Sequence, residues 1–345
     1  MGVKIRMKVR GKSKIVFMGG NLLGCNCLRY LLRAKNVKIL KVVGNYHDNG
    51  SVIEPRVWNA SLARVALNRN LPFIQPKSTH NLQFINDIQN IDRPDFIFTL
   101  EYDKILDPMI LAIPRIGTIN IHFSPLPRHR GQFPVVWSLL EDDEAGITLH
   151  WVTEKIHAGD IIATQKIRIE PEDTAYSLYM KLTKVGLELF KSYFPKIIKG
   201  TAPRIPQDES QANYHAAGYP EQRIINWNKS AKEIDRFIRA LTFPEFEPAR
   251  TYFHDMEISI LHPVEVLPPE SNGSLHAPGT IVNIGTDGLI VKTGDGDILI
   301  KKIRINESLP IDAYKLARLF DLHVGEAFRN IEKLHVETQL NLIVP

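Results

Sequence analysis

An amide and an imidazole occupy alternate positions in one short apolar run. The run is Thr-Ile-Asn-Ile-His-Phe at 118–123. Its alternation predicts a buried strand in which Asn120 and His122 project from the same face. An amide N–H can donate to an oxyanion, and an imidazole can hold or move a proton. The pair therefore suits transfer of a carbonyl-level fragment, although most isolated Asn-x-His pairs on strands have only a structural role.

The segments around this strand strengthen the chemical interpretation. Residues 124–127 (Ser-Pro-Leu-Pro) form a stiff loop, because two prolines prevent a regular ladder. The basic turn at 128–131 (Arg-His-Arg-Gly) follows, and together these segments predict a collar around a ligand. A second strand at 147–152 and a polar loop at 153–159 then return polar groups to the exit of the first strand.

The motif order resembles that of a known family. Asn-x-His-x-Ser-x-Leu-Pro-x-x-Arg-Gly-x-x-Pro starts at Asn120, Gly-Ile-Thr-x-His follows at 146–150, and Ala-Gly-x-Ile at 158–161 precedes Gln165. This order resembles the formyltransferases that use 10-formyltetrahydrofolate. They include methionyl-tRNA formyltransferase, glycinamide ribonucleotide formyltransferase and the amino-sugar nucleotide formyltransferases. The resemblance covers nearly the whole chain and implies transfer of a formyl group from 10-formyltetrahydrofolate to an amine.

One position departs from the family pattern. The family has an aspartate before the small residue and glycine of its Asp-small-Gly loop, and here that position is His157. In the family the aspartate orients the histidine and supports proton transfer through an ordered water. With His157, the carboxylate that would stabilise an imidazolium at His122 is missing, although a neutral imidazole can still relay a proton. The resemblance implies that Asn120, His122 and His157 are the catalytic residues.

Three explanations of His157 stay open. The chain is a transferase that works with His157, or it binds folate or substrate without efficient turnover, or His122 and His157 contribute to a metal site. Two histidines and an amide are a weak metal signature without a third well-spaced ligand, and His150 holds a family-typical structural position. We therefore predict no metal. Asp160 lies at a position that varies in the family, so it is not a simple replacement for the aspartate.

The resemblance also implies binding residues. It assigns the pterin cleft to the backbone around 104–106 and 153–156. By periodicity alone, Ile105 and Leu106 are better explained as the core of a helix that starts there. Arg128 and Arg130 can pair with a diphosphate, or they are solvated turn charges. The predicted donor-binding residues are Tyr102, Lys104, Ile105, Leu106, Ser124, Pro125, Leu126, Pro127, Thr153, Ile156 and Asp160, and the predicted acceptor-binding residues are Arg128, Arg130 and Gln132.

The positioning elements predict an α/β fold. From Ile15 to Leu100, strands alternate with helices expected at 22–34 and 57–70, which predicts a doubly wound, mostly parallel sheet. The first turn lacks a full G-x-G-x-x-G, which argues against a nicotinamide dinucleotide site. After a capped helix at 230–241, many short strands with glycine turns predict a small, OB-like β-barrel. We predict a basic leader at 1–14, a catalytic domain at 15–203, a linker at 204–223 and a C-terminal domain at 224–345.

Composition limits the class of protein. The 345 residues are 44% hydrophobic and 23% charged with a net charge of +5, which is typical of a soluble protein. No apolar run reaches membrane-spanning length, and the basic N-terminus lacks the apolar stretch of a signal peptide. Cys25 and Cys27 are too close to form a disulfide comfortably. We predict a cytoplasmic protein with no membrane partner.

The sequence constrains the identity of the formyl acceptor less than it constrains the family. The loop at 46–56 is nearly neutral, whereas a tRNA partner would favour more cations there. Together with 227–231 and 316–318, this loop looks more like the sugar-nucleotide branch, which includes the UDP-4-amino-4-deoxy-arabinose enzyme. We predict a small, phosphate-bearing amine, most plausibly an aminosugar nucleotide. A tRNA-directed formyltransferase and a catalytically weak folate- or nucleotide-binding protein are the alternatives, and the sequence does not predict the oligomeric state.

Overall fold

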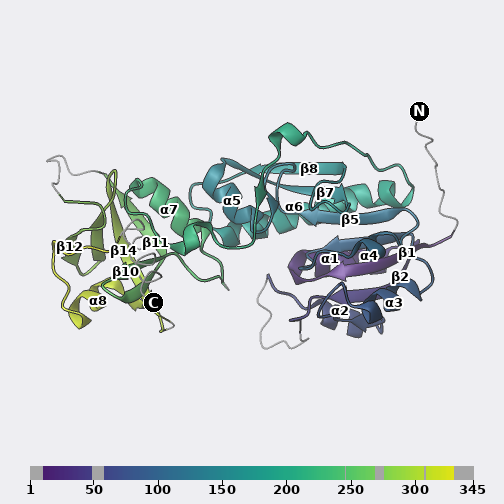
Figure 1. The fold of residues 1–345 in the computed structure, drawn as a ribbon, viewed down its shortest axis with the longest axis horizontal. Coiled ribbons are helices and arrows are strands. Elements are labelled where there is room, and N and C mark those ends of the chain that lie inside the picture. Colours follow the sequence, from purple (N-terminus) through teal and green to yellow (C-terminus); the bar gives the residue numbers. More distant parts are fainter. Residues whose placement is uncertain (1–10, 49–57, 245, 269–275, 307, 330–345) are drawn as a thin grey trace, which may run out of the picture. The chain divides into compact units, whose positions relative to one another are not determined.

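The computed structural model describes residues 11–48, 58–244, 246–268, 276–306 and 308–329. Over these residues the chain forms two compact units (Figure 1). Unit 1 comprises Met1–Pro134, Glu144–Arg168 and Tyr179–Ala216, and unit 2 comprises Val135–Asp143, Ile169–Leu178 and Ala217–Pro345. The second unit therefore takes two segments from within 15–203, the range predicted for the catalytic domain.

A seven-stranded sheet forms the centre of unit 1. Its strand order is β3-β2-β1-β4-β5-β7-β8. The first five strands in this order are parallel, whereas β7 pairs antiparallel with both β5 and β8. This mostly parallel sheet confirms the predicted doubly wound α/β class. The strands are β1 (Ser13–Gly19), β2 (Val37–Gly44), β3 (Phe73–Ile74), β4 (Phe96–Leu100), β5 (Gly117–His122), β7 (Glu144–Trp151) and β8 (Ile161–Arg168).

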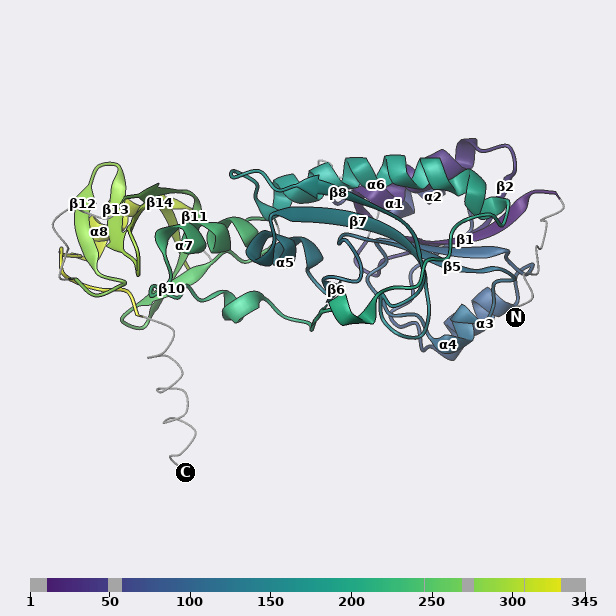
Figure 2. The same ribbon diagram turned by 90° about the horizontal axis from the view of Figure 1, so that it is seen from above.

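Helices cover both faces of this sheet. Figure 2 shows α1 and α6 on one face and α3 and α4 on the other. Alternate residues of β4 pack in opposite directions, because successive strand side chains point to opposite faces. Phe98 meets Phe190 of α6 edge-on at 5.5 Å, whereas Ile97 joins the core formed with Ile85 and Ile110. The helices of unit 1 are α1 (Asn21–Arg33), α2 (Leu62–Leu67), α3 (Leu82–Gln89), α4 (Pro108–Leu111), most of α6 (Ala175–Ile198) and the 3₁₀ turn η1 (Glu209–Gln211), whereas α5 (Pro134–Glu141) lies almost entirely in unit 2.

The carboxyl ends of β1, β4 and β5 meet where the strand order changes direction. Along the chain β1 continues to β2 on one side, while β4 and β5 lie on its other side. In open α/β sheets ligands bind at this edge. The chain leaves β4 after Leu100 and leaves β5 after His122, so both exits face the place where such a fold holds a ligand.

The segment after β4 is a loop, and the helix that periodicity predicted there is wrong. Helix α4 begins only at Pro108, and the side chain of Asp107 accepts a hydrogen bond from the Met109 N–H (2.8 Å). Proline at the first helical position and an aspartate before it explain this start. Ile105 is therefore 62% exposed, whereas Leu106 joins the core on the α3 face of the sheet.

Other sequence-based boundaries move as well. The helix predicted at 57–70 is limited to Leu62–Leu67, where Ser61 caps the first turn by accepting from the Arg64 N–H (3.0 Å). The predicted leader at 1–14 overlaps β1, which begins at Ser13, and its first ten residues lie outside the described residues. Of the near-neutral loop at 46–56, only 46–48 is described.

Residues 205–216, here called the strap, belong to unit 1 and pack against the rest of it, although their polar composition predicted part of a linker. Ile205 exchanges two backbone hydrogen bonds with Ile161 (2.8 and 3.0 Å). Further along, β9 (Tyr214–His215) pairs in parallel with β6 (Arg130–Gly131). Gly131 has a φ of +96°, and a Cβ there would lie 2.0 Å from the His215 carbonyl oxygen. This pairing therefore requires glycine at position 131.

Unit 2 is built around an antiparallel half-barrel, which confirms a second, smaller β domain. Its strand order is β10-β11-β14-β13-β12, and β15 pairs with β14. The capping box predicted for its helix is confirmed, since Ser230 and Glu233 make both reciprocal hydrogen bonds at the start of α7. The elements are α7 (Ala231–Ala240), β10 (Arg250–Phe253), β11 (Met256–Leu267), β12 (Ile281–Gly285), β13 (Gly288–Lys292), β14 (Asp297–Ile305), β15 (Ile311–Asp312), α8 (Ala313–Leu319) and the 3₁₀ turn η2 (Pro220–Arg223). Within the described ranges of the chain, no helix combines the length and apolar character needed to cross a membrane.

Candidate active site

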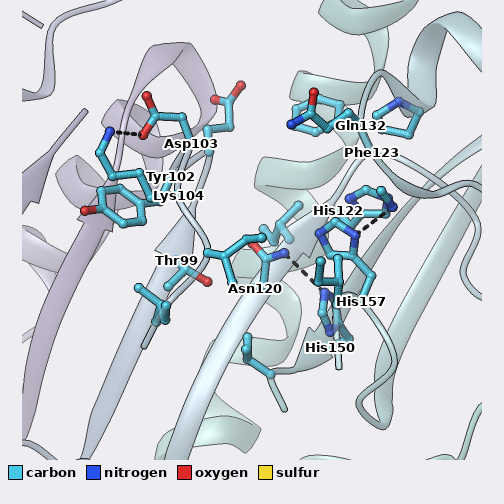
Figure 3. Close-up of a pocket in the computed structure, with 18 of the residues that line it drawn as sticks. Thr99, Tyr102, Asp103, Lys104, Asn120, His122, Phe123, Gln132, His150 and His157 are labelled. Atoms are coloured by element: carbon cyan, nitrogen blue, oxygen red, sulfur yellow. Dashed lines mark hydrogen bonds and ion pairs between the residues drawn. The ribbon is translucent and has the colours of Figure 1, made fainter. Parts of the chain in front are cut away.

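Four side chains from β5, β7 and the loop after β7 lie together at one end of the sheet (Figure 3). Asn120 and His150 face each other across the β5–β7 pair, and Asn120 Nδ2 lies 3.2 Å from His150 Nε2. His122 lies two residues further along β5, on the same face as Asn120. His157 comes from the loop, and its ring stacks on His122 with the centroids 3.8 Å apart. The structure thus brings the three predicted catalytic residues together.

Hydrogen bonds fix the orientation of the Asn120 amide. His150 donates from Nδ1 to the carbonyl oxygen of Trp151 (2.8 Å), so its Nε2 carries a lone pair. That lone pair accepts one N–H of the Asn120 amide. Among the residues that the structure describes, nothing accepts the second N–H of this amide, which therefore remains for a ligand. His150, which the sequence suggested was structural, therefore aims the amide.

The other two imidazoles are also held as single tautomers. His122 donates from Nε2 to the carbonyl oxygen of His129 (2.8 Å), which leaves the lone pair on Nδ1. His157 accepts the backbone N–H of Gly131 at Nδ1 (3.1 Å), so its own proton is on Nε2. His122 can therefore accept a proton, whereas His157 presents a donor.

Burial keeps all three rings uncharged. Desolvation lowers the pKa of His122 to about 3, although the hydrogen bond to His129 partly opposes it. Desolvation also lowers the pKa of His150 to about 4. The pKa of His157 falls well below its usual range, first through desolvation and then through His122, His150 and Arg130 nearby. His122 is thus a neutral base whose protonated form is poorly stabilised.

The stacked geometry limits what His157 can do for His122. The planes of the two rings are only 25° apart. Imidazole nitrogens donate and accept in the plane of their own ring, so stacked rings do not hydrogen-bond directly to each other. A proton relay between them would need a bridging group, whereas the stack itself fixes the orientation of His122 and keeps water from one of its faces.

A cavity of about 560 Å³ opens beside these side chains. This volume lies within the range of small-molecule sites. Figure 3 shows Tyr102, Asp103 and Lys104 across the cavity from the histidines. The predicted site residues that line it are Tyr102, Lys104, Ile105, Leu106, Asn120, His122, Gln132, Thr153, Ile156 and His157.

Comparison with known proteins decides the family. Residues 14–193 match the formyl transferase family, and residues 219–320 match the formyl transferase C-terminal domain. The chain belongs to the formyl transferase family. This confirms the predicted resemblance to folate-dependent formyltransferases, and the two matched regions make this protein a formyltransferase with both an N-terminal and a C-terminal domain of the family.

Relatives of this formyltransferase fall into two groups. The bifunctional polymyxin resistance protein ArnA of Wigglesworthia glossinidia brevipalpis is 34% identical over 262 residues, which is 76% of this chain but only 38% of ArnA. The methionyl-tRNA formyltransferase of Staphylococcus aureus (strain MW2) is 31% identical over 296 residues, covering 85% of this chain and 92% of that enzyme. Among solved structures, WlaRD, a sugar 3N-formyl transferase studied with dTDP and 5-N-formyl-THF, has a TM-score of 0.65 at 25% identity and covers 87% of this chain and 100% of WlaRD.

The predicted donor-binding residues at 124–127 do not line the cavity of this formyltransferase. Ser124 Oγ donates to the Arg128 carbonyl oxygen (2.7 Å), and the Leu126 N–H donates to Thr148 Oγ1 (3.1 Å). These bonds close the loop on itself and fasten it to β7. Ser124, Pro125, Leu126 and Pro127 thus hold the turn that carries the hydrogen-bond acceptor of His122.

Charged residues predicted to bind ligands have protein partners. Arg130 is 8% exposed and makes a bidentate ion pair with Glu209 (2.8 and 2.9 Å). Asp160 lies 3.9 Å from Arg204. Neither Arg130, Asp160 nor the exposed Arg128 lines the cavity. Their roles toward donor or acceptor therefore stay predictions.

Sequence reasoning missed several lining residues of this formyltransferase. Glu101 follows β4 and accepts hydrogen bonds from the Leu23 and Gly24 N–H groups (2.9 and 3.3 Å) at the start of α1 and from the Tyr179 hydroxyl. Desolvation raises its pKa to about 7, although these bonds oppose the shift. Its position directly after a predicted buried strand was the available signal. Tyr214, from the strap, had no such signal, because a polar segment gives no periodicity.

Proposed function

We propose that this formyltransferase transfers the formyl group of 10-formyltetrahydrofolate to the primary amine of a phosphate-bearing small molecule, an aminosugar nucleotide. The observation that carries the proposal is that Asn120 and His122 lie side by side in the wall of one ligand-sized cavity. The nucleotide and formylated folate named for WlaRD support both halves of the proposal, because that enzyme is aligned over its full length with this chain.

The cavity suits the folate ring system. Ile105, Leu106, Val152 and Ile156 supply apolar surface for a flat heteroaromatic ring, while the histidine end supplies polar groups. This combination of a mostly apolar wall and a few directed polar groups suits a flat ring that carries hydrogen-bonding groups along its edge. The formyl group would then lie toward Asn120, where the amide has a free N–H.

Each transfer step can be given to an atom of this chain. The amine nitrogen attacks the formyl carbon, and the formyl oxygen gains negative charge that the second N–H of Asn120 stabilises. His122 Nδ1 accepts the proton that the amine nitrogen loses. The bond between the formyl carbon and N10 then breaks, and N10 receives that proton, giving tetrahydrofolate and the N-formyl product.

His157 affects how well His122 can carry a positive charge. A carboxylate at position 157 would stabilise positive charge on His122, whereas a neutral ring with its proton on Nε2 does not. We assign His157 the role of orienting His122 and excluding water from one face of its ring. Because the imidazolium of His122 is then less stable, we expect the acceptor amine to bind in its neutral form.

A second acceptor, methionyl-tRNA, is favoured by a different observation. The 31% identity with the Staphylococcus aureus methionyl-tRNA formyltransferase spans 92% of that enzyme. We still prefer the aminosugar nucleotide, because the loop at 46–56 carries few cations for a phosphate backbone. Salt dependence separates the two, since binding that tracks many phosphates weakens steeply as salt rises.

The deciding experiment measures tetrahydrofolate release from 10-formyltetrahydrofolate with matched acceptors. The panel contains dTDP- and UDP-linked amino sugars, their deaminated analogues and methionyl-tRNA. Release with an amino-sugar nucleotide but not with its deaminated analogue supports the proposal. Release with methionyl-tRNA alone would assign the second function. Folate binding without release for any acceptor would identify a binding protein.

A further inference from the structure

Gln207 of the strap uses all of its hydrogen-bonding capacity on two loops of the active site. Its Nε2 donates to the carbonyl oxygens of His157 (2.8 Å) and Gly159 (2.7 Å). Its Oε1 accepts from Arg130 Nε (3.2 Å) and Nη2 (2.7 Å). The reverse amide orientation would place donors against a guanidinium and an oxygen against two carbonyls, so the network fixes this one.

The loop that Gln207 holds adopts an unfavourable backbone conformation at its key residue. His157 has a φ of +53°, in the left-handed region. A non-glycine residue there persists when surrounding contacts impose it. Gln207 supplies such contacts, because its two N–H groups bind the carbonyls on both sides of Ala158.

The other end of Gln207 holds the partner loop. Arg130, fixed by Gln207 and Glu209, directly precedes Gly131, whose N–H binds the His157 ring. His129, on the other side of Arg130, provides the carbonyl that orients His122. One side chain thus connects the backbone of His157 with the turn that sets both imidazoles.

We propose that Gln207 is a positioning residue that sets the stacked arrangement of His157 on His122. It does not line the cavity, so its effect passes through the placement of the His157 ring on His122. The catalytic consequence rests on the proposed formyl transfer, whereas the structural consequence does not. Misplacement of a catalytic group by about 1 Å can cost about a hundredfold in rate, so we expect kcat to fall about ten- to a hundredfold with a small change in KM.

Three variants separate the two ends of Gln207. Gln207→Met keeps the length and removes all four bonds. Gln207→Glu keeps acceptors for Arg130 but removes the donors to the His157 and Gly159 carbonyls. Gln211→Ala is the matched control, because Gln211 is an exposed glutamine of the same strap whose side chain donates to Asp208 (2.8 Å), away from both loops. Gln207→Met and Gln207→Glu should both impair turnover, while the control stays within about twofold of wild type. If Gln207 acted through Arg130 alone, Gln207→Glu would behave like wild type.

The deciding measurements are histidine ¹⁵N NMR of the ligand-free protein and a double-mutant cycle with His157→Ala. In wild type, His157 should show one tautomer with the proton on Nε2, and in Gln207→Met it should show averaged nitrogens while His150 is unchanged. In the His157→Ala background, adding Gln207→Met should lower kcat by less than about twofold. An unchanged His157 spectrum, or a full kcat loss in the His157→Ala background, would overturn the proposal. The NMR result tests the positioning role of Gln207 even if no acceptor is formylated. Thermal melting of Gln207→Met and Gln207→Glu identifies which of the two variants is folded, and the comparison with wild type is made with that variant.

Discussion

The ring of His157 lies against the ring of His122, with centroids 3.8 Å apart and 25° between the planes. Each ring removes water from a face of the other, and desolvation is the largest cause of the lowered pKa of both. His157 stands where the family resemblance predicts an aspartate, and in this structure it forms a packed pair with His122 in which His122 is neutral and oriented.

Replacing His157 by aspartate should raise kcat about tenfold or more. A carboxylate close to His122 stabilises its imidazolium, and one pKa unit corresponds to about 1.4 kcal/mol. The matched control is His157→Asn, which lacks the charge. Aspartate and asparagine both tolerate the positive φ at this position. Tetrahydrofolate release is the readout, and equal rates for the two variants would show that charge at position 157 is not what limits turnover.

The pH dependence of catalysis should follow the acceptor rather than His122. Because the pKa of His122 is lowered to about 3, this base stays neutral at every pH from about 5 upward. The acceptor must lose its ammonium proton before attack, so kcat/KM should fall as the pH drops below the pKa of that amine. Two acceptors with different amine pKa values should give displaced profiles. Coincident profiles with an inflection near pH 6.5 would contradict this prediction.

The same lowered pKa predicts how folding stability depends on pH. An unfolded histidine titrates near 6.5, whereas folded His122 titrates at about 3, so the unfolded state binds more protons between these values. The stabilising effect is complete above pH 6.5 and is lost as the pH falls toward 3, by up to about 1.4 kcal/mol per pH unit for each such histidine.

Urea unfolding at pH 7, 5.5 and 4.5 measures this effect. His122→Gln should have a shallower loss of stability with falling pH than wild type, because it removes one of the buried titrating groups. His254→Asn is the control, since His254 is exposed and asparagine suits its φ of +52°. The same slope in wild type and His122→Gln would mean that His122 does not remain neutral in the folded protein.

The sequence predicts the sheet and the shared strand face of Asn120 and His122 because both depend on local patterns, whereas only the family resemblance pointed to His157. Apolar runs such as the one in β4 mark buried strands, and alternation along β5 places Asn120 and His122 on one face. The α7 capping box is equally local, since Ser230 and Glu233 lie three residues apart. Where the stabilising contacts lie within a few residues, propensity and pattern are sufficient.

The supporting contacts of the site are not predictable in this way. Gln207 lies 50 residues from His157 in sequence, and nothing in a polar, proline-bearing strap distinguishes it from its neighbours. Arg130 presents the opposite difficulty, because a basic turn suggests a phosphate ligand while the structure pairs it with Glu209. Such partners depend on tertiary folding, which brings distant polar groups to loops whose carbonyls need donors.

Substituting Gly159 by alanine should impair the site through the backbone. A Cβ at this position would lie 1.9 Å from the Trp151 carbonyl oxygen, which is a backbone atom and cannot rotate away. The loop must therefore shift, and the shift would loosen the Gln207 contact to the Gly159 carbonyl and displace His157. We expect a loss of about 1–3 kcal/mol in stability and a fall in kcat of about tenfold or more.

Gly285→Ala is the matched control for this prediction. A Cβ at Gly285 would meet its nearest atom, Asn283 Oδ1, at 3.7 Å, which is ordinary contact. That variant should stay within about 0.5 kcal/mol of wild type and keep full activity. Urea unfolding and tetrahydrofolate release are measured for both variants. Stability lost equally in the two would point to a general glycine effect, whereas normal turnover in Gly159→Ala would show that the His157 loop tolerates displacement and that the stacked pair is not what sets the rate.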